Sequence, residues 1–258
     1  MRLFVAYPTD VTDAQWQLLA PVLARGSRGP ARALSRRTVR GAILYQARTG
    51  CQWRYLPSEF GPWNTIWKTF CRWRDRGVWQ QAMGLLRRAL RVREGRDPEP
   101  SMVMVDSQVT KGGRGGPSFH ETHGKHRLTG AKKTIAIDDL GLPVGAAVHG
   151  ARRHDVRAAR DLLDELLPNH PRVADVLGDR GFRGLAGPNA CEHGVNVEIK
   201  HRDRLPGEFK PIRPLWRVED AFAELGRWRR LSRSFEATSA SATAWLQVAC
   251  VGWMLTLL

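Results

Sequence analysis

The chain has 258 residues, of which 42% are hydrophobic and 26% charged. These proportions are typical of a folded globular protein and exclude a collagen-like, coiled-coil or wholly disordered chain. Charge is the unusual feature, because 41 Lys and Arg face 25 Asp and Glu, which leaves +16 at pH 7. A polyanion such as DNA is therefore the partner that the composition favours.

The positive excess lies mainly in the first hundred residues, which hold 18 basic and 7 acidic side chains. This asymmetry indicates a basic binding domain ahead of a more balanced one. The polar, proline-containing stretch 93–101 is the predicted linker. We therefore expect a helical DNA-binding domain over 1–92 and a second domain over 102–258.

Two features bear on the compartment. The four cysteines form no CxxC pair, and the first residues show no signal-peptide pattern, which favours a reduced cytoplasmic protein, associated with the nucleoid if it binds DNA.

The apolar run 242–258 raises the question of a membrane span. It is short, contains Thr243, Gln247 and Thr256, and lacks basic flanks, so we expect a buried terminal helix and no membrane partner.

Hydrophobic residues at helical spacing predict four helices in the first domain. They cover residues 12–24, a stretch capped by Ser35 and ended by Gly50, residues 64–76, and a stretch after Gly77.

The third predicted helix carries a basic stripe of Lys68, Arg72 and Arg76 opposite an apolar face. A solvated surface and a phosphate-binding face explain this stripe about equally well. Within so basic a domain, the pattern is compatible with a helix-turn-helix reader of DNA. Trp63 and Trp67 can either pack in the bundle or stack on exposed bases, and both interpretations stay open.

From residue 102 the pattern changes to short apolar runs, which are typical of core strands. The runs are 102–105, 134–137, 142–148, 173–177 and 195–199. Asp155 is predicted to cap a helix between the third and fourth runs. Three strands, a helix, a strand, a helix and a strand indicate a mixed α/β sheet.

Three acidic residues stand out in this second domain. Asp106 and Asp179 directly follow apolar runs, and Glu219 lies on a predicted helix whose same face carries Arg227 and Arg230. Converging carboxylates repel one another, and Mg²⁺ relieves such repulsion. Taken singly, each acid is more often a turn or cap residue than a metal ligand.

The stretch 111–133 combines glycine turns, basic residues and the spacing HExH at 120–123. That spacing excludes an HExxH zinc helix. We interpret the stretch as a DNA-contacting loop that ends with Lys132 and Lys133. Asp138 and the residue after it are interpreted as an ordinary hairpin turn.

Seven segments in this order resemble a known family: GAILYQARTGCQWRYLP, GPWNTIWKTFCRWRDRGVW, VDSQ, IAIDDLGLPV, HDVRAARDLL, GDRGF and WRVEDAFAELGRWRRLSRSFE. They closely resemble transposases of the "insertion sequence five" group, which are DDE enzymes. The resemblance runs from about residue 9 to the C-terminus. Seven ordered segments are far more specific than a single motif.

The resemblance implies that Asp106, Asp179 and Glu219 are the catalytic triad and metal ligands of a ribonuclease-H-like domain. Two Mg²⁺ ions, for which Mn²⁺ can substitute, would activate water or a DNA 3′-hydroxyl and stabilise the leaving oxygen. The implied partners are terminal inverted repeats, target DNA and further copies of the chain in a homodimer or larger assembly. The DNA-binding residues expected on the two domains are Lys68, Arg72, Arg76, Lys132, Lys133, Arg227 and Arg230.

One departure from the family pattern concerns the third acid. Similar proteins carry a basic or hydroxyl-rich sequence after it, whereas Asp220 and Ala221 follow Glu219 here. Two alternatives therefore accompany the transposase hypothesis. One is a catalytically inactive, decayed copy that binds the element ends as a repressor, and the other is a related nuclease without strand transfer.

Overall fold

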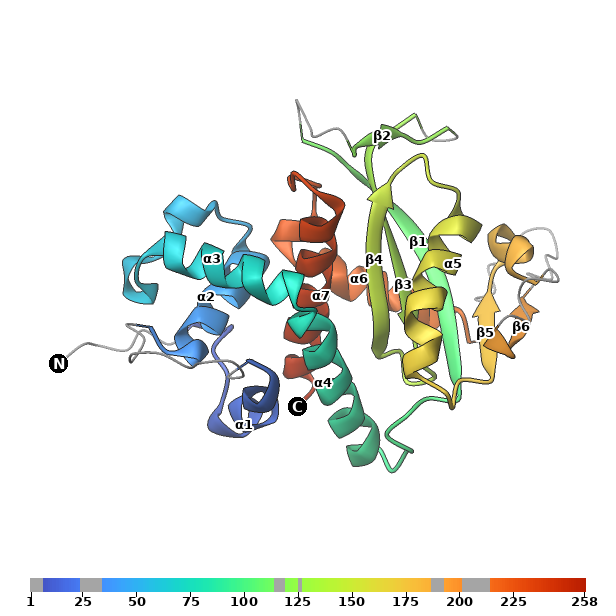
Figure 1. Cartoon of the computed structure of the whole chain (residues 1–258), viewed down its shortest axis with the longest axis horizontal. Helices are drawn as coiled ribbons and strands as arrows, with labels where there is room; N and C mark the ends of the chain where they lie inside the picture. The colour runs from blue at the N-terminus through green and yellow to red at the C-terminus, as the bar shows by residue number, and fades with distance from the viewer. Residues whose placement is uncertain (1–6, 24–33, 114–118, 125–126, 187–192, 201–213) are drawn as a thin grey trace, which may run out of the picture.

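The computed structural model describes residues 7–23, 34–113, 119–124, 127–186, 193–200 and 214–258. The N-terminal helices gather at one end of the molecule and a twisted sheet lies at the other, with the last helix, α7 (Ser239–Thr256), between them (Figure 1). The chain is a mixed α/β protein in which helices precede a mixed sheet, as predicted.

Four helices occupy the N-terminal third: α1 (Asp13–Leu23), α2 (Arg36–Thr49), α3 (Trp63–Asp75) and α4 (Val78–Arg93). Ser35 caps α2 by accepting the Thr38 N–H at 3.0 Å, and Gly50 ends the helix at φ 72°, where glycine is favoured. Two 3-10 turns, η1 (Trp53–Tyr55) and η2 (Ser58–Phe60), separate α2 from α3. The helical bundle is confirmed, but this connection is longer than the tight turn of a helix-turn-helix motif.

The sheet is built from β1 (Met102–Lys111), β2 (Glu121–Thr122), β3 (Thr129–Ile137), β4 (Pro143–Gly150), β5 (Asp175–Gly178) and β6 (Asn196–Ile199). Its order is β2-β3-β1-β5-β6, and β4 also pairs with β3. β3 runs antiparallel to β1 and β4, whereas β5 and β6 run parallel to β1. This topology is consistent with a ribonuclease-H-like domain. The short β2 was not predicted, and a 3-10 helix, η4 (Arg180–Leu185), stands where a helix was expected between the last two strands.

Helices cover both faces of the sheet (Figure 1). On one face lie α5 (Asp155–Leu166) and the short η3 (Leu167–Asn169), and on the other lie α6 (Trp216–Gly226), η6 (Arg229–Leu231) and α7. His154, rather than the predicted Asp155, caps α5, because its Nδ1 accepts the Val156 N–H at 3.3 Å. Each face of the sheet therefore has its own apolar layer.

Helix α7 joins the two halves of the molecule. The Trp245 ring on α7 stacks on Phe70 of α3 with centroids 4.5 Å apart. Gly252 allows the Trp228 ring to approach so closely that a Cβ there would lie 2.0 Å from it. α7 is buried along most of its length, which confirms the predicted buried terminal helix. In the described ranges, we find no helix with the length and hydrophobicity needed to span a bilayer.

Ion pairs connect the stretch predicted as a linker to both parts of the molecule. Glu99 pairs with Arg87 at 3.1 Å and with His170 at 2.9 Å. At the end of α4, Arg91 pairs with the fully buried Asp138 at 2.7 Å. One apolar core also runs from α2 and α3 through α7 to the sheet. The division at 92 and 102 therefore stays a prediction about sequence units.

Candidate active site and nucleic-acid interface

The register of β1 and β5 accounts for the approach of Asp106 and Asp179. Their parallel pairing ends with Met104 opposite Leu177. Asp106 lies two residues after Met104, and Asp179 lies two residues after Leu177. Residues at the same level of neighbouring strands lie about 5 Å apart, with side chains on the same face. Asp179 follows β5 as predicted, whereas Asp106 lies within β1, which continues to Lys111.

Glu219 reaches the same place from helix α6. Asp106 pairs across the sheet with Ile135, whose side chain belongs to the apolar core shared with Val218 of α6. Directly paired residues point to the same face, so Asp106 points toward α6. Glu219 lies in the first turn of that helix. A cavity of about 50 Å³ is lined by Val105, Asp106, Asp179, Leu215, Trp216, Val218 and Glu219.

The electrostatics of Asp106 reflect this convergence. Burial raises the pKa of Asp106 to about 7, and the negative charges of Asp179, Asp155 and Glu219 act in the same direction. A hydrogen bond from the Ser107 N–H at 2.7 Å opposes the rise in pKa. The described residues that line the cavity include no Lys, Arg or His.

This donor set fits a hard divalent cation, because carboxylate oxygens are the preferred ligands of such ions. The raised pKa of Asp106, to which the neighbouring carboxylates contribute, is a second sign that a cation suits the cavity. Within the described part of the chain, no three His, Cys, Asp or Glu side chains already stand at metal-binding spacing. The types of residue present therefore fit a metal ion, although their carboxylates are further apart than in a formed metal site.

Sequence analysis missed Trp216, which lines the acid cavity. It precedes Glu219 by three residues on α6, so the two side chains lie on neighbouring parts of one helix face. The indole is 38% exposed, and the Arg217 guanidinium lies 5.3 Å from its ring centroid. The i, i+3 spacing from the third acid was the available signal.

Lys132 and Lys133 do not form the predicted DNA-contacting surface. They lie on β3 rather than in a loop, and alternation along the strand points them to opposite faces. Both residues are buried, with 1% and 9% of their surface exposed. Lys132 Nζ donates to Arg153 O and Asp155 Oδ1, each at 2.5 Å. Lys133 Nζ donates to Leu231 O at 2.7 Å, so the prediction was wrong for both lysines.

The expected Arg stripe beside Glu219 also needs correction. Helix α6 ends at Gly226, so Arg227 and Arg230 do not continue the face of Glu219. Arg230 pairs with Glu236 and lies over the Trp245 ring at 5.2 Å from its centroid. Its side chain is only 12% exposed, and we therefore withdraw it as a DNA contact. Arg227, at 66% exposure, stays a predicted contact.

The remainder of the stretch 111–133 is described only in part, because residues 114–118 and 125–126 lie outside the described ranges. His120 Nε2 shares a hydrogen bond with Ser234 Oγ at 2.8 Å, which ties the stretch to the segment after α6. The predicted turn at Asp138 is confirmed. Its Oδ1 accepts the N–H groups of Leu140 and Leu142, both at 2.9 Å.

On α3, the structure separates the two faces that the sequence indicated. Ile66, Phe70 and Trp73 are buried. The basic residues Lys68, Arg72 and Arg76 are exposed to solvent on the other side. Contact of this basic face with DNA stays a prediction.

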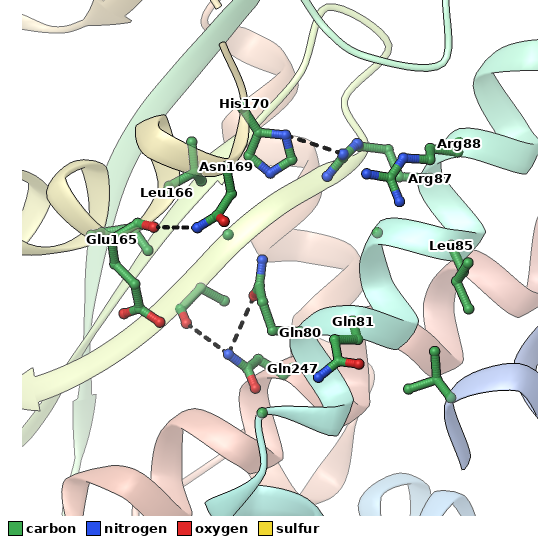
Figure 2. A pocket seen from close by; sticks show the side chains of 16 residues that line it. Gln80, Gln81, Leu85, Arg87, Arg88, Glu165, Leu166, Asn169, His170 and Gln247 are labelled. Atoms are coloured by element: carbon green, nitrogen blue, oxygen red, sulfur yellow. Dashed lines mark hydrogen bonds between the residues drawn. The ribbon is translucent and has the colours of Figure 1, made fainter. Parts of the chain in front are cut away.

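A larger cavity of about 530 Å³ lies away from the acids, between α4, β4 and α5 (Figure 2). Amides cap the free edge of β4 there: Gln80 Nε2 donates to Val144 O at 2.8 Å, and Gln247 Nε2 donates to Ala146 O at 3.4 Å. Side chains that satisfy an edge strand keep it from pairing with another chain. We assign these glutamines a structural role.

A mixed sheet that gathers carboxylates from two strand positions and a helix defines the class of DDE enzymes with a ribonuclease-H-like fold. Residues 97–254 match the family described as "Transposase DDE domain", so the chain belongs to that family. Residues 11–83 match a second family, described as "Putative transposase of IS4/5 family". The chain is thus a DNA-acting transposase of IS4/5 type, with a metal-dependent DDE domain.

Two relatives resemble parts of the chain. "Uncharacterized protein y4sN" of Sinorhizobium fredii is 28% identical over 102 residues, which are 38% of this chain and 74% of that protein. "Insertion element IS402 uncharacterized 16.2 kDa protein" of Burkholderia cepacia is 31% identical over 119 residues, or 43% of this chain and 80% of that protein. No solved structure matches the chain.

Proposed function

We propose that the chain is the transposase of a bacterial insertion sequence, which binds the terminal inverted repeats of its element and catalyses cleavage and joining of DNA strands. The observation that carries this proposal is the single cavity lined by Asp106, Asp179 and Glu219. Membership of the DDE family supports it. We assign these three side chains as the catalytic metal ligands.

Backbone hydrogen bonds prepare the two aspartates for this role. The Ser107 N–H holds Asp106 Oδ1 at 2.7 Å, and the Gly181 N–H holds Asp179 Oδ1 at 2.8 Å. Fixing one oxygen of each carboxylate sets the direction of the second. We assign Mg²⁺ as the ion, two per site, with Mn²⁺ as a substitute. When bound, the ions supply activation of the attacking water or 3′-hydroxyl and stabilise the leaving oxygen.

The DNA reaches this site, we propose, along the basic surface of the N-terminal domain. Lys68, Arg72 and Arg76 would contact phosphates of the terminal repeat, and Arg227 would contact DNA beyond the end of α6. Two ends must be held together for joining, so a homodimer or larger assembly is part of the proposal. Because the substrate is chromosomal DNA, we place the protein at the nucleoid, in the cytoplasm.

A second candidate function is an inactive copy that binds the ends as a repressor. All three acids are present and line one cavity, which favours the active enzyme. Asp220, exposed beside Glu219, is the feature that keeps the alternative in view. A nuclease without strand transfer would cleave DNA but form no joined product.

The test is an assay of the full chain on labelled duplexes that carry the inverted repeats flanking its gene. We expect 3′-end nicking and joined product in Mg²⁺, and neither in EDTA. Tight binding of the repeats without cleavage in Mg²⁺ or Mn²⁺ would overturn the enzymatic proposal and support the repressor. Cleavage without joining would support the nuclease.

A further inference from the structure

An exposed aromatic edge adjoins the basic face of α3. Trp63 and Trp67 lie one turn apart on this helix, and their side chains are 37% and 43% exposed. Tyr55, in the preceding 3-10 turn η1, is 75% exposed. Large aromatic residues left in water at one place commonly mark a binding surface. The buried face of α3 already has Ile66 and Phe70, so these indoles are not needed to fill the core.

Cations surround this edge. The Arg54 guanidinium lies over the Trp63 ring, 5.6 Å from its centroid. Lys68 follows Trp67 directly, and Arg72 lies one turn further along the helix. Within the described ranges, no ion pair joins Arg54, Lys68 or Arg72 to an acidic side chain. Their charge is therefore available to an anionic partner.

The nearby acids are already engaged by other side chains. Glu59 accepts a hydrogen bond from the Tyr7 hydroxyl, and Asp75 pairs with Arg74 at 2.7 Å. The surface therefore presents aromatic faces beside positive charge, without competing free carboxylates at these two positions. Flat aromatic rings stack on nucleic-acid bases, and flanking cations hold the phosphates.

The spacing of the indoles restricts the form of DNA that suits them. One turn of helix separates the Cα atoms of Trp63 and Trp67 by about 6 Å along the axis, whereas stacked bases of a duplex strand follow one another at about 3.4 Å. A paired, stacked base also hides its faces. Bases that have left the duplex expose their faces, so unpaired bases suit the two indoles better than paired ones.

From this geometry we propose that Trp63 and Trp67 form a stacking platform for unpaired bases, with Arg54, Lys68 and Arg72 holding the adjoining phosphates. The proposal rests on the proposed DNA-binding function and deepens it. It makes α3 a reader of opened or frayed DNA as well as of duplex, which suits an enzyme that acts where strands are cut.

The experiment measures binding of the full chain to two fluorescein-labelled probes by anisotropy. One probe is a blunt 24-base-pair duplex of arbitrary sequence, and the other is the same duplex with an eight-nucleotide oligo-dT extension. Wild type is expected to bind the extended probe at least about 5-fold more tightly, since stacking of a single base is worth roughly 5- to 150-fold in affinity. The double variant Trp63→Ala, Trp67→Ala is expected to lose this preference while it binds the blunt probe as wild type does.

Two matched variants show what each part of the surface does. Trp67→Phe keeps a stacking ring and is expected to keep the preference. Lys68→Ala with Arg72→Ala is expected to weaken both probes by a similar factor. Because the indoles are partly exposed, the variants should fold, and circular dichroism and Tm check this directly.

Three results would overturn the proposal. The first is equal binding of both probes by wild type, and the second is retention of the preference by the double Trp variant. The third is a change of that variant from dimer to monomer in sedimentation, which would make the aromatic edge an interface between copies. Failure to bind either probe would remove the proposed DNA-binding function as well. Normal duplex binding without a preference would remove only the stacking platform.

Discussion

Replacing Asp106 by Asn should stabilise the metal-free protein while it removes catalysis. The reason is the raised pKa of Asp106, about 7 in the folded protein against 3.8 for an ordinary Asp. In the folded state the charged form is penalised by burial and by neighbouring carboxylates. An amide of the same shape carries no charge and escapes that penalty.

The size of the effect follows from the shift. At about 1.4 kcal/mol per pKa unit, the rise corresponds to on the order of 4 kcal/mol of unfolding free energy at high pH. Asp106 is partly exposed, so we expect roughly half of this, about 2 kcal/mol. For a chain of this length, that raises Tm by about 4–8 °C.

The size of the stability difference depends on pH. Because the folded pKa of Asp106 is raised, the folded state binds its proton more tightly than the unfolded chain does. The free energy of unfolding of wild type therefore falls as pH rises from about 4 to about 7. The Asn variant has no carboxyl group at this position, so its stability does not fall for this reason. The difference in Tm should be small near pH 4 and largest at pH 8.

Differential scanning fluorimetry in EDTA, from pH 4 to pH 8.5, measures this difference. Asp220→Asn, an exposed acid next to Glu219, is the matched control and should leave Tm nearly unchanged. Added Mg²⁺ should stabilise wild type more than Asp106→Asn and narrow the gap. An Asn variant that is less stable than wild type at pH 8, or a difference that does not grow with pH, would refute the reasoning.

Two further predictions concern the ion pairs and the basic face. Arg91→Ala leaves the fully buried Asp138 without its cation and should lower the free energy of unfolding in urea by about 3–5 kcal/mol. Arg93→Ala, at a side chain about half exposed, should change it little, and equal effects of the two variants would contradict the buried pair. For duplex DNA, Lys68→Ala with Arg72→Ala should make the negative slope of log affinity against log salt shallower by about 2, whereas the control Arg93→Ala should not. An unchanged slope in the double variant would remove α3 from the interface.

The sequence predicted the fold well wherever a periodic pattern matched one environment. The four N-terminal helices, the Ser35 cap and the buried last helix follow from spacing and cap residues. β1 was predicted too short, because its second half carries polar residues where the strand approaches the acid cavity. Composition cannot show that polar residues continue a strand when the partner strand is far away in sequence.

The three candidate acids were identified from the sequence, but their surroundings were not. Lys132 and Lys133 were assigned to a loop because they end a stretch of glycine turns and basic residues, yet each finds an acceptor on a different face of the sheet. Arg230 was placed on the helix of Glu219 because the predicted helix was extended past Gly226, the residue at which α6 ends. The partners of Lys132, Lys133 and Arg230 come from other parts of the fold, which the local sequence pattern does not reveal.

The central claim is that Asp106, Asp179 and Glu219 form one metal-dependent active site. Cleavage of terminal-repeat duplexes in Mg²⁺, compared among Asp106→Asn, Asp179→Asn and Glu219→Gln, tests it most directly, with Asp220→Asn as control. We predict that each of the three variants binds the repeats but does not cut them, and that the control cuts as wild type does. Cleavage by any of the three at the wild-type rate, or loss of cleavage in Asp220→Asn alone, would contradict the account.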